Sequence, residues 1–179
     1  GFDGMFIHGC GGIGQSYPGS CGDAPGNTYF DPAILHNGKF EKTKGYCTDV
    51  FFSQAARWIE TVKTQDKPFF CYIPTNAPHA PLQVRAEDEA RYKDKVKQAN
   101  VAKFFGMIAN VDDSVGRLLD KLKEWGLEKD TLVIFSSDNG GVVNRNNEEG
   151  AKAMDTGLAI NGALRGGKHD IWEGGFREP

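Results

Sequence analysis

Two short apolar runs on either side of one long amphipathic segment constrain the fold of this chain more than any other feature. The runs cover residues 69–73 and 132–136, and each has the length and composition of a buried strand. Between them, apolar residues recur every three or four positions over residues 101–125, which predicts one long helix. Strand, helix and strand in this order are typical of a parallel sheet with helices packed on it. We therefore expect an α/β fold.

A second helix is expected earlier in the chain. Phe51, Ile59 and Val62 fall on one face at helical spacing. Thr48 or Asp49 can cap this helix by accepting hydrogen bonds from the free N–H groups of its first turn. By contrast, the regions 9–45 and 140–163 show no sustained period and are rich in glycine and asparagine. Long irregular segments in a compact domain are usually functional, so we expect these two to shape a binding pocket.

Length, charge and cysteine spacing exclude several classes of protein. The 179 residues fit one domain, and the net charge of −3 lacks the basic face that a nucleic-acid-binding protein needs. No apolar run approaches the roughly 18 residues of a membrane span. The cysteines form no CxxC pair, which argues against a zinc cluster. Cys10 and Cys21 could pair in an oxidising compartment, and Cys71 in its apolar run is expected to be a buried thiol.

A histidine between prolines follows the first predicted strand, in the sequence Asn-Ala-Pro-His-Ala-Pro at 76–81. Ligands of parallel sheets bind beyond the carboxyl ends of the strands, where this segment begins. Prolines that fix the backbone would hold His79 in one orientation, ready to donate a proton or to bind an anion. Taken alone, the segment is more typical of a proline-rich turn that happens to contain a histidine.

Asp138 and Asn139 follow the second predicted strand, in Ser-Ser-Asp-Asn-Gly-Gly at 136–141. A carboxylate and an amide oxygen are hard ligands of the kind that calcium and magnesium prefer. Two oxygen donors do not complete such a site, so further ligands must come from elsewhere. Asp, Asn and Gly also favour turns, which is the alternative interpretation of this motif.

A third motif, Leu-Arg-Gly-Gly-Lys at 164–168, combines glycines with a cation. Glycine lets a backbone approach a ligand closely, and Lys168 would offer a point charge to a sulfate or a phosphate. The alternative is an exposed lysine in a glycine-rich loop. Glu173 and Arg177, a few residues later, are expected to form an internal ion pair rather than to act in catalysis.

Together, and in this order, these motifs resemble the sulfatase family. The resemblance also includes Gly-Phe-Asp at 1–3, Gly-Tyr-Cys-Thr-Asp at 45–49, Asn-Val-Asp at 110–112 in the long helix, and Glu-Gly-Gly-Phe-Arg-Glu-Pro at 173–179. It covers nearly the whole chain and is weakest over residues 9–45. The combination of motifs is far more specific than any one of them.

Membership of that family would imply a fold and a site. The fold would be part of the alkaline-phosphatase-like α/β fold, with a mainly parallel sheet flanked by helices. Asp138 and Asn139 would be two ligands of a calcium ion, with magnesium as the alternative. His79 and Lys168 would contact the sulfate and assist departure of the alcohol. The nucleophile of the family is a formylglycine, made from a cysteine or serine in a Cys-x-Pro-x-Arg type of motif.

That nucleophile motif does not occur here. No cysteine begins Cys-x-Pro-x-Arg, and the family's earlier aspartate pair and its Lys-and-His segment are also missing. We therefore expect residues 1–179 to be an internal part of a single sulfatase catalytic domain, without the part that carries the nucleophile and without the C-terminal part. On this interpretation the 179-residue chain is inactive alone.

Two other functions fit the same residues. One is a phosphate or phosphonate ester hydrolase of the same superfamily, which would share the metal site and differ in nucleophile. The other is a non-catalytic anion-binding protein on this fold. For a sulfatase, the expected substrate is a sulfated carbohydrate or another sulfated small molecule, such as an aryl sulfate; Arg145 in the region 140–163 would suit a sugar sulfate. The resemblance implies a periplasmic, extracellular or lysosomal location.

Overall fold

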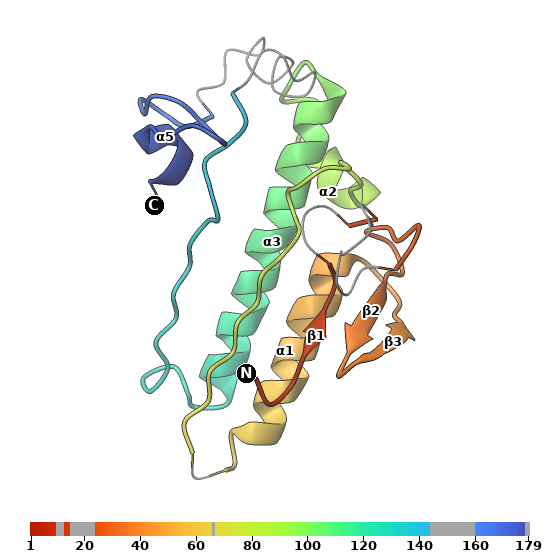
Figure 1. Ribbon diagram of the computed structural model, residues 1–179, viewed down its shortest axis with the longest axis vertical. Helices are drawn as coiled ribbons and strands as arrows, with labels where there is room; N and C mark the ends of the chain where they lie inside the picture. Colours follow the sequence, from red (N-terminus) through yellow and green to blue (C-terminus); the bar gives the residue numbers. More distant parts are fainter. Residues whose placement is uncertain (10–12, 15–23, 66, 144–159, 178–179) are drawn as a thin grey trace. The chain divides into compact units, whose positions relative to one another are not determined.

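The structure, a computed structural model, describes residues 1–9, 13–14, 24–65, 67–143 and 160–177, which belong to two compact units. The first unit, residues 1–129, contains a sheet and the helices α1, α2 and α3 (Figure 1). The second unit, residues 130–179, contains the short helix α5 (Glu173–Phe176) among its described residues. The site residues expected from the sequence are thus divided between two units.

The sheet of the first unit is antiparallel. Its strands are β1 (Phe6–Ile7), β2 (Ala33–His36) and β3 (Lys39–Lys42), paired in the order β1-β2-β3. The tight turn between β2 and β3 consists of Asn37 and Gly38, with φ of 47° and 85°. Asn-Gly suits this turn because both of its positions need a positive φ. The hairpin corrects the expectation that this part of the chain is irregular, and the Asn-Gly pair was the signal for it.

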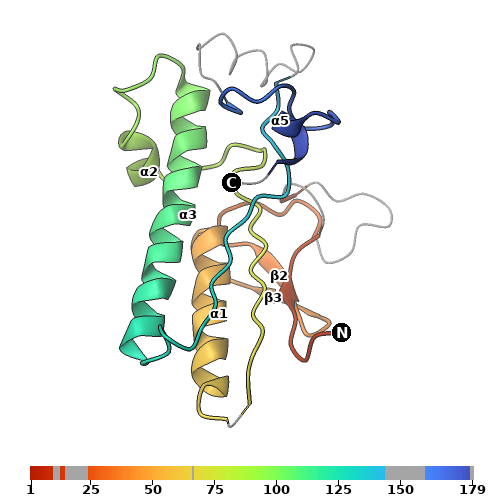
Figure 2. The same cartoon turned by 90° about the vertical axis from the view of Figure 1, so that its left-hand side faces the viewer.

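Neither of the two predicted strands pairs with another strand among the described residues. Segments 69–73 and 132–136 run as extended chain (Figures 1 and 2). Much of their apolar surface is exposed, 72% for Phe70 and 84% for Leu132. An apolar run predicts extended conformation, but a ladder also needs the backbone of a second strand at its edge. The expected parallel pairing is therefore not formed within the described part of this chain.

Helix α1 (Cys47–Val62) begins two or three residues before the start that a cap at Thr48 or Asp49 would give. Its N-cap is Tyr46, and no side chain caps it, so the predicted capping by Thr48 or Asp49 is wrong. Thr48 is buried, while the Asp49 carboxylate accepts hydrogen bonds from Arg85 and from α3 instead. On the predicted apolar face, Phe51, Phe52 and Ile59 are buried, while Val62 at the end of the helix is half-buried.

Helix α3 (Ala99–Glu124) confirms the long helix predicted over residues 101–125. It ends before Gly126, which has a φ of 72° that suits glycine at a helix C-terminus. Helices α1 and α3 lie side by side in both views (Figures 1 and 2). The short helix α2 (Ala86–Ala90) packs on α3 at Gly106, where a Cβ atom would lie 2.9 Å from the backbone of Asp88.

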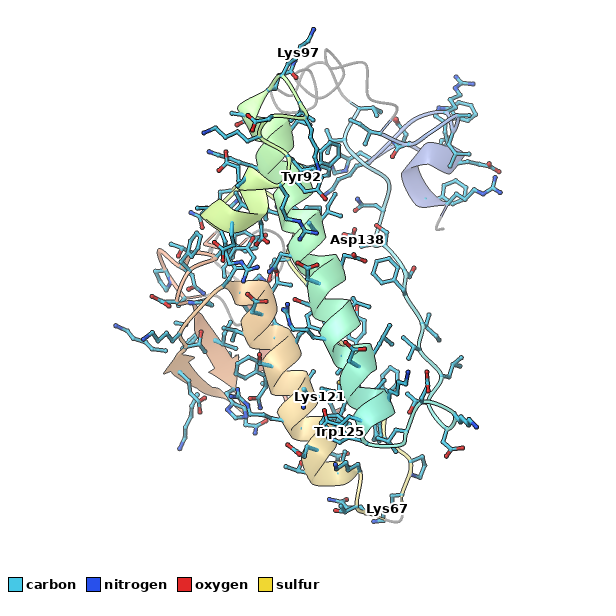
Figure 3. All side chains as sticks on the ribbon, turned by 180° about the vertical axis from the view of Figure 1, so that it is seen from behind. Lys67, Tyr92, Lys97, Lys121, Trp125 and Asp138 are labelled. Atoms are coloured by element: carbon cyan, nitrogen blue, oxygen red, sulfur yellow. The ribbon has the colours of Figure 1, made fainter. Side chains whose placement is uncertain are left out.

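The C-terminal end of α3 is polar. Lys121 forms an ion pair with Glu124 at 2.7 Å, and the Lys63 ammonium lies 4.8 Å from the centre of the Trp125 ring. Lys121 and Trp125 are marked in Figure 3, which shows the side chains of the described residues. None of the helices in the described ranges is long and apolar enough to cross a membrane.

The hydrophobic core of the first unit lies between the hairpin, α1 and α3. Tyr29, Ile34 and Met107 are each 0% exposed, and Cys47 and Phe51 of α1 pack in the same cluster. Two of these residues come from the region expected to be a binding loop. That region therefore contributes to the core, and its tyrosine reaches the segment that carries His79.

Candidate functional site

Two tyrosines hold the segment that contains His79. The Tyr29 hydroxyl donates a hydrogen bond to the His79 carbonyl at 2.9 Å. The Tyr46 hydroxyl donates to the Gln83 carbonyl at 2.8 Å, and the Gln83 side-chain oxygen accepts from the Tyr29 N–H at 2.9 Å. The two rings stack with centroids 5.7 Å apart. Both ends of residues 79–83 are thus bonded to one aromatic pair from the core.

The His79 imidazole is oriented by its own backbone. Nδ1 lies 2.8 Å from the carbonyl oxygen of Ala80, in a segment where the bonds preceding Pro78 and Pro81 are both cis. A carbonyl oxygen only accepts hydrogen bonds, so Nδ1 carries the proton of this contact. The other ring nitrogen, Nε2, has no hydrogen-bond partner in the described ranges. His79 is half-buried, and Nε2 is the atom through which it can act on a ligand.

Burial keeps both tyrosines protonated. Desolvation raises the pKa of Tyr29 well above its usual value, and the neighbouring Tyr46 and Cys47 raise it further. Desolvation also raises the pKa of Tyr46, with Cys47 as the next contribution. A neutral hydroxyl can donate, whereas a phenolate cannot. The two hydroxyls therefore remain hydrogen-bond donors across the neutral pH range.

A polar cluster that sequence reasoning missed connects α1, α2 and α3. The Asp49 carboxylate accepts hydrogen bonds from Arg85 at 3.0 Å and Asn110 at 3.3 Å, and also from Ser114 and Arg117 of α3. Arg85 binds both oxygens of the buried Asp88, at 2.6 and 3.1 Å, and this hydrogen bonding raises its pKa. Asp49 and Asn110 both belong to motifs that resemble the sulfatase family, at 45–49 and 110–112. A motif does not show which residues bond to one another, so the cluster itself could not be predicted.

In the second unit, the structure brings Lys168 together with the segment of Asp138 and Asn139. The Lys168 N–H donates to the Gly141 carbonyl at 3.0 Å, and the Gly140 N–H donates to the Gly175 carbonyl at 3.0 Å. Asp138, labelled in Figure 3, is exposed. Neither its carboxylate nor the Lys168 ammonium has a hydrogen-bond or ion-pair partner in the described part of the chain. Three of the four predicted site residues thus belong to one loop cluster, and His79 belongs to the first unit.

Glycine makes this cluster possible. A Cβ on Gly140 would collide with the carbonyl oxygen of Gly174, and one on Gly167 would collide with that of Gly141. A Cβ on Gly174 would lie 2.7 Å from the Arg165 carbonyl oxygen. These backbone segments meet where no side chain fits, so the glycines of the second and third motifs have a packing role.

A third component of the cluster, Asn161, was missed from the sequence. Its side chain bonds to Gly141 and Gly166, at distances between 2.8 and 3.2 Å. Asn161 lies in the region 140–163, which was expected to shape a binding pocket. No motif or regular spacing in the sequence distinguishes it from the other asparagines of that region. The expected Glu173–Arg177 ion pair is confirmed at 2.9 Å, with both side chains exposed.

The oxygen donors of the cluster fit a hard cation in kind but not in number. Asp138 and Asn139 offer a carboxylate and an amide oxygen, whereas calcium takes six to eight oxygen ligands. The described residues contain no group of three or more His, Cys, Asp or Glu side chains that could hold a metal ion. Any complete site would need ligands beyond these.

Some expectations fall outside the described residues or change in detail. Cys10, Cys21 and Arg145 lie outside the described residues. Cys71 is half-buried rather than buried, and its partial burial raises the pKa of its thiol.

Comparison with known proteins gives consistent results. A family model described as Sulfatase matches residues 8–179. The chain is 31% identical over 157 residues to the uncharacterized sulfatase YdeN of Escherichia coli K12, covering 87% of this chain and 26% of that protein. It is 33% identical over 138 residues to the N-acetylgalactosamine-6-sulfatase of Mus musculus, and the match covers 74% of this chain and 22% of that protein.

A solved structure shows the same fold. Ps i-CgsB in complex with k-i-k-neocarrahexaose matches with a TM-score of 0.70 and 35% identity, over 82% of this chain and 30% of that one. This likeness confirms the α/β, alkaline-phosphatase-like fold class expected from the sequence, of which this chain forms part. The chain spans 22–30% of the length of these three proteins. Because the family model covers almost all of its residues, the chain belongs to the sulfatase family.

Proposed function

We propose that this chain is part of a longer enzyme that hydrolyses sulfate esters. The observation that carries the proposal is the hydrogen bond from the Lys168 N–H to the Gly141 carbonyl, two residues beyond Asn139. Through this bond the backbone of Lys168 lies beside the segment that carries Asp138 and Asn139, which supports an ammonium, a carboxylate and an amide oxygen acting in one site. Membership of the sulfatase family supports the same assignment.

The chemistry of these residues suits the reaction. A sulfate monoester carries negative charge on its non-bridging oxygens, and its alcohol needs a proton as it leaves. Lys168 would bind those oxygens, and the fixed ammonium would stabilise charge that develops on them. His79, protonated on both ring nitrogens as the imidazolium, would donate the Nε2 proton to the departing oxygen while its Nδ1–H stays bonded to the Ala80 carbonyl, and it would be left as the neutral imidazole.

A metal ion and a nucleophile complete the proposal. Asp138 and Asn139 would supply two of the ligands of a calcium ion, or alternatively magnesium, whose positive charge would also face the sulfate. In this family, formylglycine supplies the attacking hydroxyl, and its parent cysteine or serine would lie outside these 179 residues. The isolated chain should therefore be inactive, and metal-dependent release of sulfate by it would contradict the proposal.

The substrate class we propose is a sulfated carbohydrate. One relative is named as an N-acetylgalactosamine-6-sulfatase, and one structural neighbour was solved with a carrahexaose. Both names point to sugar sulfates. An aryl sulfate is the alternative that the assay should include.

The test measures hydrolysis by the full-length protein that contains this chain. Sulfated oligosaccharides, an aryl sulfate and an aryl phosphate serve as substrates. Lys168→Ala and His79→Ala should each lower kcat/KM for the sulfate ester about 100-fold or more. The matched controls, Lys129→Ala and His36→Ala, change the same residue types elsewhere and should leave it unchanged. Preference for the phosphate ester would instead indicate a phosphate ester hydrolase, and binding without turnover would indicate an anion-binding protein.

A further inference from the structure

Asn161 joins the two segments that carry the candidate ligands of the second unit. Its Oδ1 accepts a hydrogen bond from the Gly141 N–H at 2.8 Å. Its Nδ2 donates to the Gly141 carbonyl at 3.2 Å and to the Gly166 carbonyl at 2.9 Å. Gly141 lies two residues after Asn139, and Gly166 lies two residues before Lys168. One side-chain amide therefore connects both segments through their backbone atoms.

The Gly141 carbonyl is the atom at which the two segments meet. It accepts from the Asn161 amide and also from the Lys168 N–H, the latter at 3.0 Å. A carbonyl oxygen has two lone pairs, so these two donors use its full capacity. The atom that Asn161 orients is thus the atom that fixes the backbone of Lys168.

In the part of the second unit that the structure describes, no apolar side chain is buried. Among residues 130–143 and 160–177, only Gly167, Gly174 and Gly175 are buried. The nearby apolar side chain of Ile171 is 85% exposed. Hydrogen bonds and close backbone contacts therefore carry the local structure, and Asn161 supplies three of those bonds.

We propose that Asn161 is a positioning residue that sets the distance between Lys168 and the pair Asp138–Asn139. This rests on the function proposed above and deepens it. Asn161 acts through the main chain of Gly141 and Gly166, so it need not touch the ester or the metal. Without its amide, the two segments can move apart, and the Lys168 ammonium and the Asp138 and Asn139 oxygens no longer converge on one sulfate group.

The test compares Asn161→Ala with Asn100→Ala, the same change in α3, in the full-length protein. We expect Asn161→Ala to lower kcat about 100-fold and to weaken calcium binding about 10-fold by calorimetry, as for residues that orient metal ligands. Hydrogen exchange should become faster in peptides 138–143 and 164–170 and stay unchanged in α3. Asn161→Asp retains the bond from the Gly141 N–H and loses both donated bonds, so its kcat should fall about 10-fold.

Three results would be decisive. Wild-type kcat, calcium binding and loop exchange in Asn161→Ala would overturn the proposal. A lower melting temperature with unchanged kcat per folded molecule would also overturn it, because that is the signature of a purely structural residue. If the wild-type protein hydrolyses no sulfate ester, the proposed function fails. Faster loop exchange and weaker calcium binding in Asn161→Ala would then still support the positioning role.

Discussion

The two units hold their candidate site residues in opposite ways. In the first unit, His79 is fixed by Tyr29 and Tyr46, large side chains that belong to the hydrophobic core. In the second, Lys168 is fixed through backbone hydrogen bonds and Asn161, and the buried residues in its described ranges are glycines. Large core side chains hold the first site residue, whereas close backbone contacts between glycines and the side-chain amide of Asn161 hold the second.

This difference determines which changes each unit can accept. Side-chain packing is lost in proportion to the atoms removed, because each atom contributes its own contacts. A backbone contact between glycines behaves differently. Even the single Cβ atom of alanine would collide with the opposite backbone. We therefore expect added atoms at the glycine contacts to be most damaging in the second unit, and removal of core or polar side chains to be most damaging in the first.

The largest effect is expected from Gly140→Ala. The new Cβ would collide with the Gly174 carbonyl oxygen and disturb the neighbouring hydrogen bond from the Gly140 N–H to the Gly175 carbonyl. Overpacking against backbone should destabilise the second unit by about 3 kcal/mol. Hydrogen exchange of peptides 138–143 and 164–175 in the full-length protein measures this, and both should lose protection.

Gly116→Ala is the matched control for that change. Gly116 lies in α3, and no atom would come within 4 Å of a Cβ there. Alanine is the better helix former, so the same methyl group should stabilise the first unit by about 0.5–1 kcal/mol. Equal protection of peptides 138–143 in both variants would refute the idea that the second unit is held by glycine contacts.

The second effect concerns removal of atoms from the first unit. Asp49→Ala takes away the acceptor shared by Arg85, Asn110, Ser114 and Arg117. The Asp49 side chain is 25% exposed, so water replaces part of what is lost, and we expect a destabilisation of about 2 kcal/mol. Urea unfolding followed by circular dichroism measures it. Asp113→Ala, which breaks the more exposed pair with Arg91, should cost under about 1 kcal/mol.

Sequence reasoning succeeded where one segment carries its own signal. The periodicity of residues 101–125 predicted α3 to within two residues at its start and one at its end, and Phe51 and Ile59 marked the buried face of α1. The motifs of Asp138 and Lys168 lie in contact through their backbones, whereas the chemical roles of the two side chains stay a prediction. In each case the information was local, because helix periodicity and motif spacing lie within a few turns of chain.

Sequence reasoning failed where strand pairing or a side-chain hydrogen bond depends on a partner distant in the sequence. Segment 69–73 is extended as predicted, but its apolar character could not show which backbone would pair with it. Asp49 was assigned to a helix cap because its partners Arg85 and Asn110 are 36 and 61 residues away. Asn161 was overlooked for the same reason, since its bonds to Gly141 span 20 residues.

A third prediction sharpens the comparison, because it places a glycine contact inside the first unit. A Cβ on Gly106 would lie 2.9 Å from both the Asp88 backbone and the Val84 side chain. Gly106→Ala should therefore push α2 away from α3 and destabilise the unit by about 1–2 kcal/mol. The Val84 methyl can shift, which makes this effect smaller than that of Gly140→Ala. Urea unfolding against Gly116→Ala in the same helix measures it, and a stabilised Gly106→Ala variant would contradict the close approach of the helices.

The smallest effect is expected from Tyr29→Phe, which removes only the hydroxyl that donates to the His79 carbonyl. At pH 7 the loss of this bond should cost about 1 kcal/mol, because the carbonyl stays half-buried without its donor. The pH dependence separates this hydroxyl from general packing. Burial raises the pKa of Tyr29 above the value of 10.0 that applies in the unfolded chain, so above pH 10 the unfolded state loses a proton that the folded state keeps.

Wild-type stability should therefore fall as the pH rises from 10 to 11, and Tyr29→Phe should lose about 1 kcal/mol less over that interval. Urea midpoints at pH 8, 10 and 11 measure the difference, with the exposed Tyr72→Phe as the control. The Tyr72 side chain is 68% exposed, so its removal should leave the alkaline slope unchanged. Identical slopes in wild type and Tyr29→Phe would mean that the hydroxyl is not buried against His79. In that case the Tyr29 hydroxyl does not hold the His79 segment, and the bond from the Tyr46 hydroxyl to the Gln83 carbonyl is the contact to test next.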